Sequence, residues 1–105
     1  MDKPYDYKKY LPLTESTYYI LLALTEPLHG YGIMQKVEIL SDGTVEIGAG
    51  TLYGALQALE KEALIIKIGD EERRKIYALT EKGREILKQQ VKRLTIMVRS
   101  GSVLE

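Results

Sequence analysis

The sequence predicts a mainly α-helical domain with one small β-hairpin. Apolar residues recur with helical spacing in four segments, and each segment is bounded by a turn or a capping signal. Two strand-like runs lie between the third and fourth segments and are joined by a short polar turn. The chain has 105 residues, of which 45% are hydrophobic, so we expect a single globular domain and not a disordered tail.

The first helix is predicted over residues 14–26. Thr14 is a suitable N-cap, and Pro27 ends the helix because proline cannot continue its hydrogen-bond ladder. Residues 1–12 precede this helix and are predicted to form an irregular N-terminal arm. The arm contains three tyrosines, Tyr5, Tyr7 and Tyr10.

Two further helices follow, with a short strand predicted between them. A tight connection over residues 27–30 leads into a helix over residues 30–40. Residues 44–47 alternate in polarity and include β-branched side chains, which predicts a strand. The next helix opens at residues 48–51 and keeps an i, i+3, i+4, i+7 apolar pattern as far as Ala63.

The last part of the chain is predicted to form a hairpin and a long helix. Residues 64–68 and 73–79 are the expected strands, and the polar residues 69–72 form their turn. A helix over residues 81–99 follows a threonine cap, and the tail over residues 100–105 is expected to fray.

These elements assemble naturally into a winged helix-turn-helix. The second and third helices form the helix-turn-helix, and the hairpin is the wing. The sequence therefore predicts a winged helix-turn-helix domain over residues 13–80 with an N-terminal helix, followed by a C-terminal dimerisation helix over residues 81–99.

Five motifs occur in the order and with the gaps of one known family. They are Pro12-Leu13-Thr14, His29-Gly30-Tyr31-Gly32-Ile33, Gly50-Thr51-Leu52-Tyr53-Gly54-Ala55-Leu56, Leu59-Glu60-Lys61-Glu62-Ala63-Leu64-Ile65 and Arg73-Arg74-Lys75-Ile76-Tyr77-Ala78-Leu79-Thr80-Glu81-Lys82-Gly83. On these motifs the chain resembles the PadR family of transcriptional regulators, in particular its short subclass with a single C-terminal helix. The resemblance implies a homodimeric, DNA-binding repressor that a small ligand can release. The last helix differs from that of some short members, which stack flat drugs on aromatic residues, because it has none.

The charge distribution suggests an anionic partner, although the formal net charge is zero. Residues 1–72 hold 6 Lys and no Arg against 12 acidic residues, whereas residues 73–99 hold 9 basic residues against 2 acidic ones. Such asymmetry between the halves of a chain indicates nucleic-acid binding. A solvated face on the last helix explains the same pattern equally well.

In a helix-turn-helix, the N-terminal end of the second helix enters the major groove of DNA. Small residues at this end let backbone amides approach a phosphate, and hydroxyl or amide side chains can contact phosphates and base edges. The predicted DNA-contact residues of this helix are Ala49, Gly50, Thr51, Tyr53 and Gln57. For Thr51 the alternative is a helix cap, and for Tyr53 it is a cover over the preceding helix.

Further DNA contacts are predicted from the preceding helix, which crosses the DNA backbone, and from the wing. The candidates are Tyr31, Gln35 and Lys36 on the helix, and Lys67, Arg73, Arg74 and Lys75 on the wing strands. For Tyr31 the alternative is packing against the third helix. The acidic wing tip, residues 70–72, opposes phosphate contact at the tip itself.

The last helix is predicted to form the dimer interface. Leu87, Val91, Leu94 and Val98 form a heptad-like seam, which Met97 widens. The expected partner surface is the first helix of a second copy, with Tyr18, Tyr19 and Leu22; the alternative is that the helix packs wholly on its own domain. The same region could hold a small aromatic effector between Tyr18, Tyr19, Leu22, Leu94 and Met97.

The composition argues against several other functions. The chain has no Cys and one His, so it offers no zinc site, and we expect no metal, no cofactor and no enzymatic activity. No apolar run approaches the roughly 20 residues that span a bilayer, and no secretory signal opens the sequence, so we expect a cytoplasmic protein. The alternative function is a winged-helix module that binds protein and not specific DNA, which the zero net charge and the acidic wing tip favour mildly.

Overall fold

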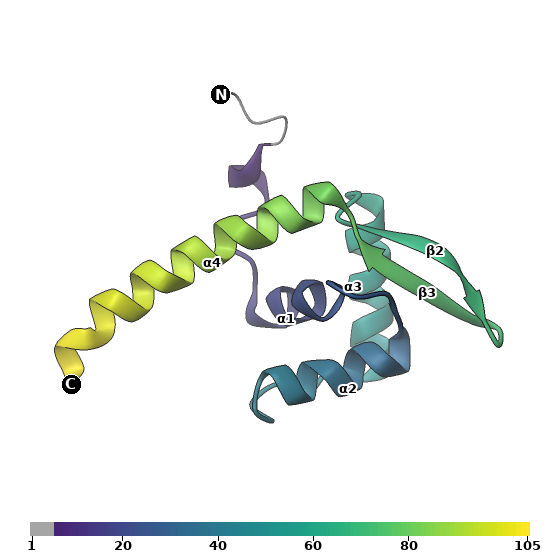
Figure 1. Cartoon of the computed structure of the whole chain (residues 1–105), viewed down its shortest axis with the longest axis horizontal. Helices are drawn as coiled ribbons and strands as arrows, with labels where there is room; N and C mark the ends of the chain where they lie inside the picture. Colours follow the sequence, from purple (N-terminus) through teal and green to yellow (C-terminus); the bar gives the residue numbers. More distant parts are fainter. Residues whose placement is uncertain (1–5) are drawn as a thin grey trace.

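The computed structural model describes residues 6–105, apart from the side chain of Glu71. The predicted arm therefore lies partly outside the described residues, as does Tyr5. The chain order is a 3-10 turn η1 (Tyr7–Lys9), α1 (Glu15–Ala23), β1 (Leu28–His29), α2 (Gly30–Leu40), α3 (Ala49–Lys61), β2 (Ile65–Glu71), β3 (Arg74–Leu79), α4 (Glu81–Gly101) and a final 3-10 turn η2 (Ser102–Leu104). Figure 1 shows the β2–β3 hairpin and the C-terminal half of α4 projecting from opposite sides of the helical body.

The predicted fold class is confirmed: the domain is mostly helical and has a small antiparallel sheet with the strand order β1-β3-β2. The predicted strand over residues 44–47 is wrong, because this segment is irregular and the third strand is Leu28–His29. The alternation of residues 44–47 reflects burial of Val45 and Ile47 in the core. The Val45 N–H donates to Ser41 Oγ at 3.1 Å, so a side chain takes the place of a partner strand.

Three element ends differ from the prediction. The first helix ends at Ala23, three residues before the predicted end, because the chain must turn there to place β1 beside β3. In addition, Pro27 disfavours the helical conformation at the residue before it. The hairpin turn is only Glu72 and Arg73, both with positive φ, so β2 runs three residues further than expected and β3 begins one residue later. The last helix continues to Gly101 and into η2, since Ser102 donates its hydroxyl to the Arg99 carbonyl and continues the helical turn.

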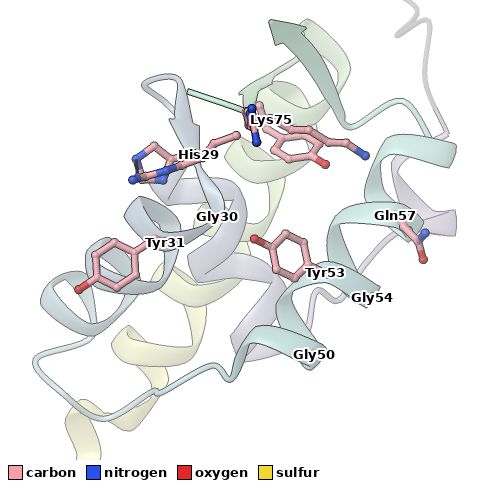
Figure 2. A pocket seen from close by; sticks show the side chains of 11 residues that line it. His29, Gly30, Tyr31, Gly50, Tyr53, Gly54, Gln57 and Lys75 are labelled. Carbon is pink, nitrogen blue, oxygen red and sulfur yellow. Dashed lines mark hydrogen bonds between the residues drawn. The ribbon is translucent and has the colours of Figure 1, made fainter. Parts of the chain in front are cut away.

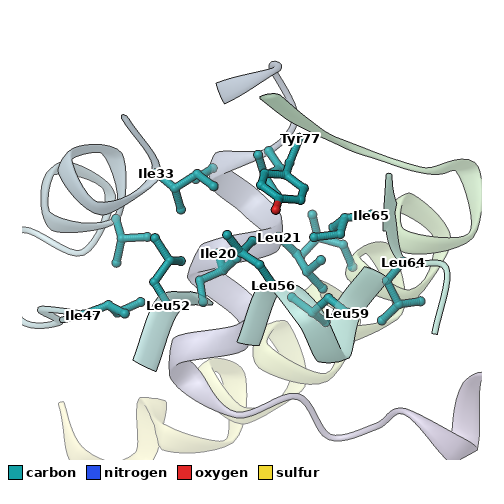
Figure 3. Close-up of a cluster of buried hydrophobic side chains, with 14 of the residues drawn as sticks. Ile20, Leu21, Ile33, Ile47, Leu52, Leu56, Leu59, Leu64, Ile65 and Tyr77 are labelled. Carbon is teal, nitrogen blue, oxygen red and sulfur yellow. The ribbon is translucent and has the colours of Figure 1, made fainter. Parts of the chain in front are cut away.

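The core lies between the helix-turn-helix, the hairpin and the first half of α4. Figure 3 shows its members, which come from α1, α2, α3 and the strands. The fully buried large side chains are Ile20, Leu21, Leu24, Ile33, Val37, Leu52, Leu56, Leu64, Ile65 and Ile86. Their burial fixes α3 and the wing on one common frame, which positions the exposed side chains described below.

The N-terminal segment and α4 are held against this core by specific polar contacts. Thr14 caps α1 by accepting from the Thr17 N–H at 3.1 Å, as predicted. The Leu13 N–H donates to Oε1 of buried Gln90 at 2.9 Å, which ties the start of α1 to α4. Buried residues of α4 all lie in its first half, Gly83 to Gln90. Among the described residues, no helix is long and apolar enough to cross a membrane.

Candidate nucleic-acid interface

A groove of about 770 Å³ lies between the start of α2, the outer face of α3 and β3. It is lined by His29, Gly30, Tyr31, Gly50, Tyr53, Gly54, Gln57, Arg73, Arg74, Lys75 and Tyr77. These residues include three cationic side chains and no carboxylate. The groove therefore favours an anion, although the whole chain has a formal net charge of zero.

The first turn of α3 forms one end of this groove. Gly48 is the N-cap and has no side chain to accept a capping hydrogen bond. The backbone N–H groups of the first turn are therefore not capped by this residue. Ala49, Gly50 and Thr51 are all exposed there. Thr51 is not the N-cap of the helix. Free amide donors and a helix N-terminus together suit a phosphate.

Tyr53 lies over the start of the preceding helix, as the sequence's alternative interpretation has it, and it also lines the groove. Its side chain reaches from α3 toward Gly30, and a Cβ at Gly30 would lie 2.8 Å from the Tyr53 hydroxyl oxygen (Figure 2). The residue is nevertheless 51% exposed. Tyr53 thus covers the start of α2 and also presents its ring to the groove, beside Gln57 one turn later.

Tyr77 lies at the base of the groove and was not predicted as a site residue. It is buried, and burial raises the pKa of its phenol, with further contributions from Glu60 and Tyr53. The phenol therefore stays neutral near neutral pH. From the sequence, Tyr77 could be predicted only as a packed residue of a strand. The alternation of residues along β3 does not show which helix the Tyr77 side chain faces.

The wing supplies the cations. Arg73, Arg74 and Lys75 line the groove, whereas Lys67 is exposed on β2 opposite Tyr77 and does not line it. In the hairpin register, Asp70 lies opposite Lys75 and Glu71 opposite Arg74. Arg74 and Lys75 therefore stand on β3, the groove-lining strand, while Asp70 and Glu71 stand on the neighbouring strand β2.

The predicted contact residues of α2 are only partly brought to this groove. Tyr31 lines it, and is exposed. Gln35 instead lines a hollow between α2 and the loop before α3. The Lys36 ammonium forms an ion pair with Glu26 in the turn after α1, so this cation is partly neutralised.

His29 is another groove residue that the sequence did not assign to this site, as are Gly30 and Gly54. Its Nδ1 lies 3.3 Å from the Gly32 amide nitrogen, in position to accept its N–H and cap α2, which agrees with the backbone-satisfied turn role usual for a lone histidine. Its Nε2 lies 3.1 Å from Nη1 of Arg74 on the wing. One imidazole thus joins the helix-turn-helix to the wing.

The predicted dimerisation residues divide into two groups. Leu87 is buried in the core of its own domain. Val91, Leu94 and Val98 line a shallow hollow of about 380 Å³ together with Tyr18, Thr95 and Arg99. Of the predicted effector residues, Tyr18 and Leu94 line this hollow, whereas Tyr19, Leu22 and Met97 do not. Tyr19 instead contacts the Tyr18 ring edge to face, with ring centroids 5.3 Å apart.

Comparison with known proteins identifies a family and related structures that have the same fold as this chain. The model of the "Transcriptional regulator PadR-like family" matches residues 20–89. An uncharacterized 37.1 kDa protein in transposon Tn4556 of Streptomyces fradiae is 37% identical over 87 residues, which are 82% of this chain but only 24% of that protein. The chain therefore spans about a quarter of that relative.

Two solved structures with this fold have similar sequence identities to this chain. A transcriptional regulator from Clostridium thermocellum is 27% identical, with a TM-score of 0.68 over 90% of this chain and 92% of that one. A PadR family regulator from Eggerthella lenta is 28% identical, with a TM-score of 0.68 over 93% and 90%.

A PadR family regulator from Clostridium difficile is 22% identical, with a TM-score of 0.74 over 88% of this chain and all of that one, and it shows the fold alone. The family match covers two thirds of the chain and includes both helices of the helix-turn-helix and the wing. The chain belongs to the PadR-like family, whose members are transcriptional regulators and not enzymes.

Proposed function

We propose that two copies of this chain bind a pseudo-palindromic DNA operator and repress transcription from it. The observation that supports this most strongly is the groove between α3 and the wing. It combines three cations, the free first turn of a helix and polar side chains on one exposed helix face, and no carboxylate is among the lining side chains that the structure describes. This combination provides both phosphate attraction and base contacts.

In this proposal each part of the groove has its own task. The first turn of α3 enters the major groove, where Tyr53 and Gln57 face the bases. Arg73, Arg74 and Lys75 lie against the flanking phosphates. Because α3 itself has only Lys61 as a cation, near its far end, most of the salt-dependent affinity comes from the wing.

The second half of α4 supplies the dimer interface. Val91, Ile96, Met97 and Val98 are exposed in the single chain, and Val98 is 76% exposed. The helix has 21 residues, which corresponds to about 32 Å. A second copy packed on this surface would bury the apolar residues, and a two-fold dimer would place two α3 helices about 34 Å apart, one turn of DNA.

The test is selection of bound duplexes from a randomised DNA pool at about 0.15 M salt. The proposal expects enrichment of an inverted repeat whose half-sites are one helical turn apart. A variant with Tyr53→Ala and Gln57→Ala serves as the control, because it keeps the wing cations and should lose sequence preference before it loses affinity. Binding without any enriched sequence, or no binding, would contradict the proposal and favour a protein-binding winged helix.

We further propose that a small, flat aromatic molecule regulates this activity at the hollow between α1 and α4. Its volume of about 380 Å³ is adequate for a small ligand, and Tyr18 supplies a ring with a polar hydroxyl. In a dimer, the partner's α4 would cover this hollow. A thermal-shift screen with phenolic acids and cationic dyes tests the idea, and no stabilisation by any compound would count against it.

A further inference from the structure

His29 is the only histidine of the chain and faces two N–H donors at once. The Gly32 N–H, in the first turn of α2, points to Nδ1 with an N–N distance of 3.3 Å. A guanidinium nitrogen of Arg74, on the wing, lies 3.1 Å from Nε2. Both contacts therefore require the imidazole to be the acceptor.

A neutral imidazole cannot accept at both nitrogens. One ring nitrogen has the lone pair and the other has the proton, while a guanidinium and a backbone amide have no lone pair to offer in return. The Arg74 contact needs the Nδ1–H tautomer, and the Gly32 cap needs the Nε2–H tautomer. The two hydrogen bonds are thus mutually exclusive, and each belongs to a different form of the same side chain.

The two donors differ in what else they can reach. The Gly32 amide is one of the first-turn donors that no carbonyl within the helix can satisfy. The Arg74 side chain is exposed and lines the groove, so its guanidinium can donate a charge-assisted hydrogen bond to a phosphate. A ligand in the groove would therefore change which of the two donors His29 serves.

We propose that His29 is a positioning residue that exchanges tautomers when DNA binds, an inference that rests on the proposed use of this groove. In the free protein, Nε2 accepts from Arg74 and holds the wing cation over the start of α2. When a phosphate takes Arg74, the ring proton moves from Nδ1 to Nε2 by exchange with solvent, with no net proton uptake. Nδ1 then caps α2, and the new Nε2–H donor faces the same phosphate region.

The exchange adds a side-chain link between the wing and the start of α2, which the pairing of β1 with β3 already joins through the backbone. Arg74 loses its hydrogen bond to His29 as the cap of α2 forms. The start of α2, with Tyr31 and Gly30, is therefore most rigid in the bound state. Gly30 lies against Tyr53, which faces the groove from α3. Phosphate contact at the wing is thereby transmitted to the base-reading face.

The experiment is ¹⁵N NMR of the imidazole at pH 8, where histidine side chains are ordinarily neutral. A single histidine gives a single pair of ring-nitrogen signals, and a protonated nitrogen is readily distinguished from one with a lone pair. Free wild-type protein should show Nε2 mainly with a lone pair. Arg74→Ala should convert Nε2 to the N–H type without any DNA, whereas the matched control Arg73→Ala should leave both signals unchanged.

Addition of a 20-base-pair duplex at low salt, with binding followed by fluorescence anisotropy, should give the wild-type protein the signals of free Arg74→Ala. Unchanged ring signals in Arg74→Ala, or in DNA-bound wild type, would overturn the proposal. If the duplex does not bind, the proposed function fails together with the DNA-driven step, while the Arg74→Ala spectrum separately decides whether the two donors compete.

Two substitutions at His29 separate the cap from the Arg74 contact. His29→Asn keeps an acceptor for Gly32, since asparagine is a good N-cap, but offers no ring nitrogen to Arg74. It should bind the duplex within about twofold of wild type or more tightly. His29→Ala cannot form the cap in the bound state and should bind several-fold more weakly. Equal weakening by both variants would contradict the assigned role.

Discussion

At the scale of single residues, the groove depends on a close contact between a glycine and a tyrosine. Gly30 is buried at the start of α2, and Tyr53 lies over it from α3. The absence of a side chain at Gly30 therefore sets where the Tyr53 ring can lie. This contact explains why a residue that faces the groove also stabilises the packing of two helices.

Gly30→Ala should weaken DNA binding about tenfold, or about 1.4 kcal/mol, with little loss of stability. The new Cβ would lie 2.8 Å from the Tyr53 hydroxyl, and the flexible end of the tyrosine must move out of the groove. Anisotropy titrations of a double-mutant cycle with Tyr53→Ala test this. In the Tyr53→Ala background the same change should cost almost nothing, and additive effects would show that the contact is irrelevant.

Gly83→Ala should destabilise the domain by about 3 kcal/mol or more, because core overpacking against rigid backbone is among the costly substitutions. A Cβ there would lie 2.1 Å from the Leu64 carbonyl oxygen. Gly54→Ala is the matched control, since a Cβ at this helical position meets nothing within 4 Å. It should raise the free energy of unfolding by up to about 1 kcal/mol. Urea unfolding of both variants decides the matter.

At the scale of elements, the strand on which a charged residue of the wing lies affects whether it lines the groove. Arg74 and Lys75 stand on β3 and line the groove, whereas Lys67 and Asp70 stand on β2 and do not. The net charge of the hairpin is consequently a poor guide to the field in the groove. What matters is that, among the side chains that the structure describes, no carboxylate lines the groove beside its three cations.

Arg73→Ala should reduce the salt dependence of DNA binding. If the residue contacts one phosphate in each protomer, the slope of log K against log salt should become shallower by about 1.8. Anisotropy titrations between about 0.05 and 0.2 M salt measure this slope. Lys88→Ala, which removes a cation of α4 that pairs with Glu85 away from the groove, should leave it unchanged. An equal effect of both substitutions would show that only total charge matters.

At the scale of the whole molecule, α4 divides into a half that belongs to the domain and a half that leaves it. Its first half contributes Ile86 and Leu87 to the core, and its second half projects with exposed apolar side chains (Figure 1). One small domain cannot cover that second half. A partner surface would remove this area from water, which is the main driving force for association.

Val98→Glu should convert a dimer to a monomer at micromolar concentration, because a charge would then be buried in the proposed interface without a partner. Sedimentation velocity measures the change directly, and the melting temperature of the variant should no longer depend on concentration. Ile39→Glu is the control: Ile39 is 74% exposed on α2, and this change should leave the assembly intact. A monomeric wild type would refute the interface.

The sequence predicted most helices well because their caps and apolar stripes are local signals. Thr14 and the residues around Gly48 marked helix starts that the structure has within a residue or two. The third strand was misplaced because two residues, Leu28 and His29, are too few to show a pattern. Their pairing with β3 depends on a segment nearly fifty residues away.

The sequence by itself determined the fold class, the family and most of the cationic and polar residues of the groove, because periodicity, caps and motif spacing are properties of neighbouring residues. Only the tertiary structure decided which of these residues meet. It brought Arg74 to His29, laid Tyr53 over Gly30 and placed Leu87 in the core. These contacts join separate elements, so they depend on how the core packs and not on any local pattern along the chain.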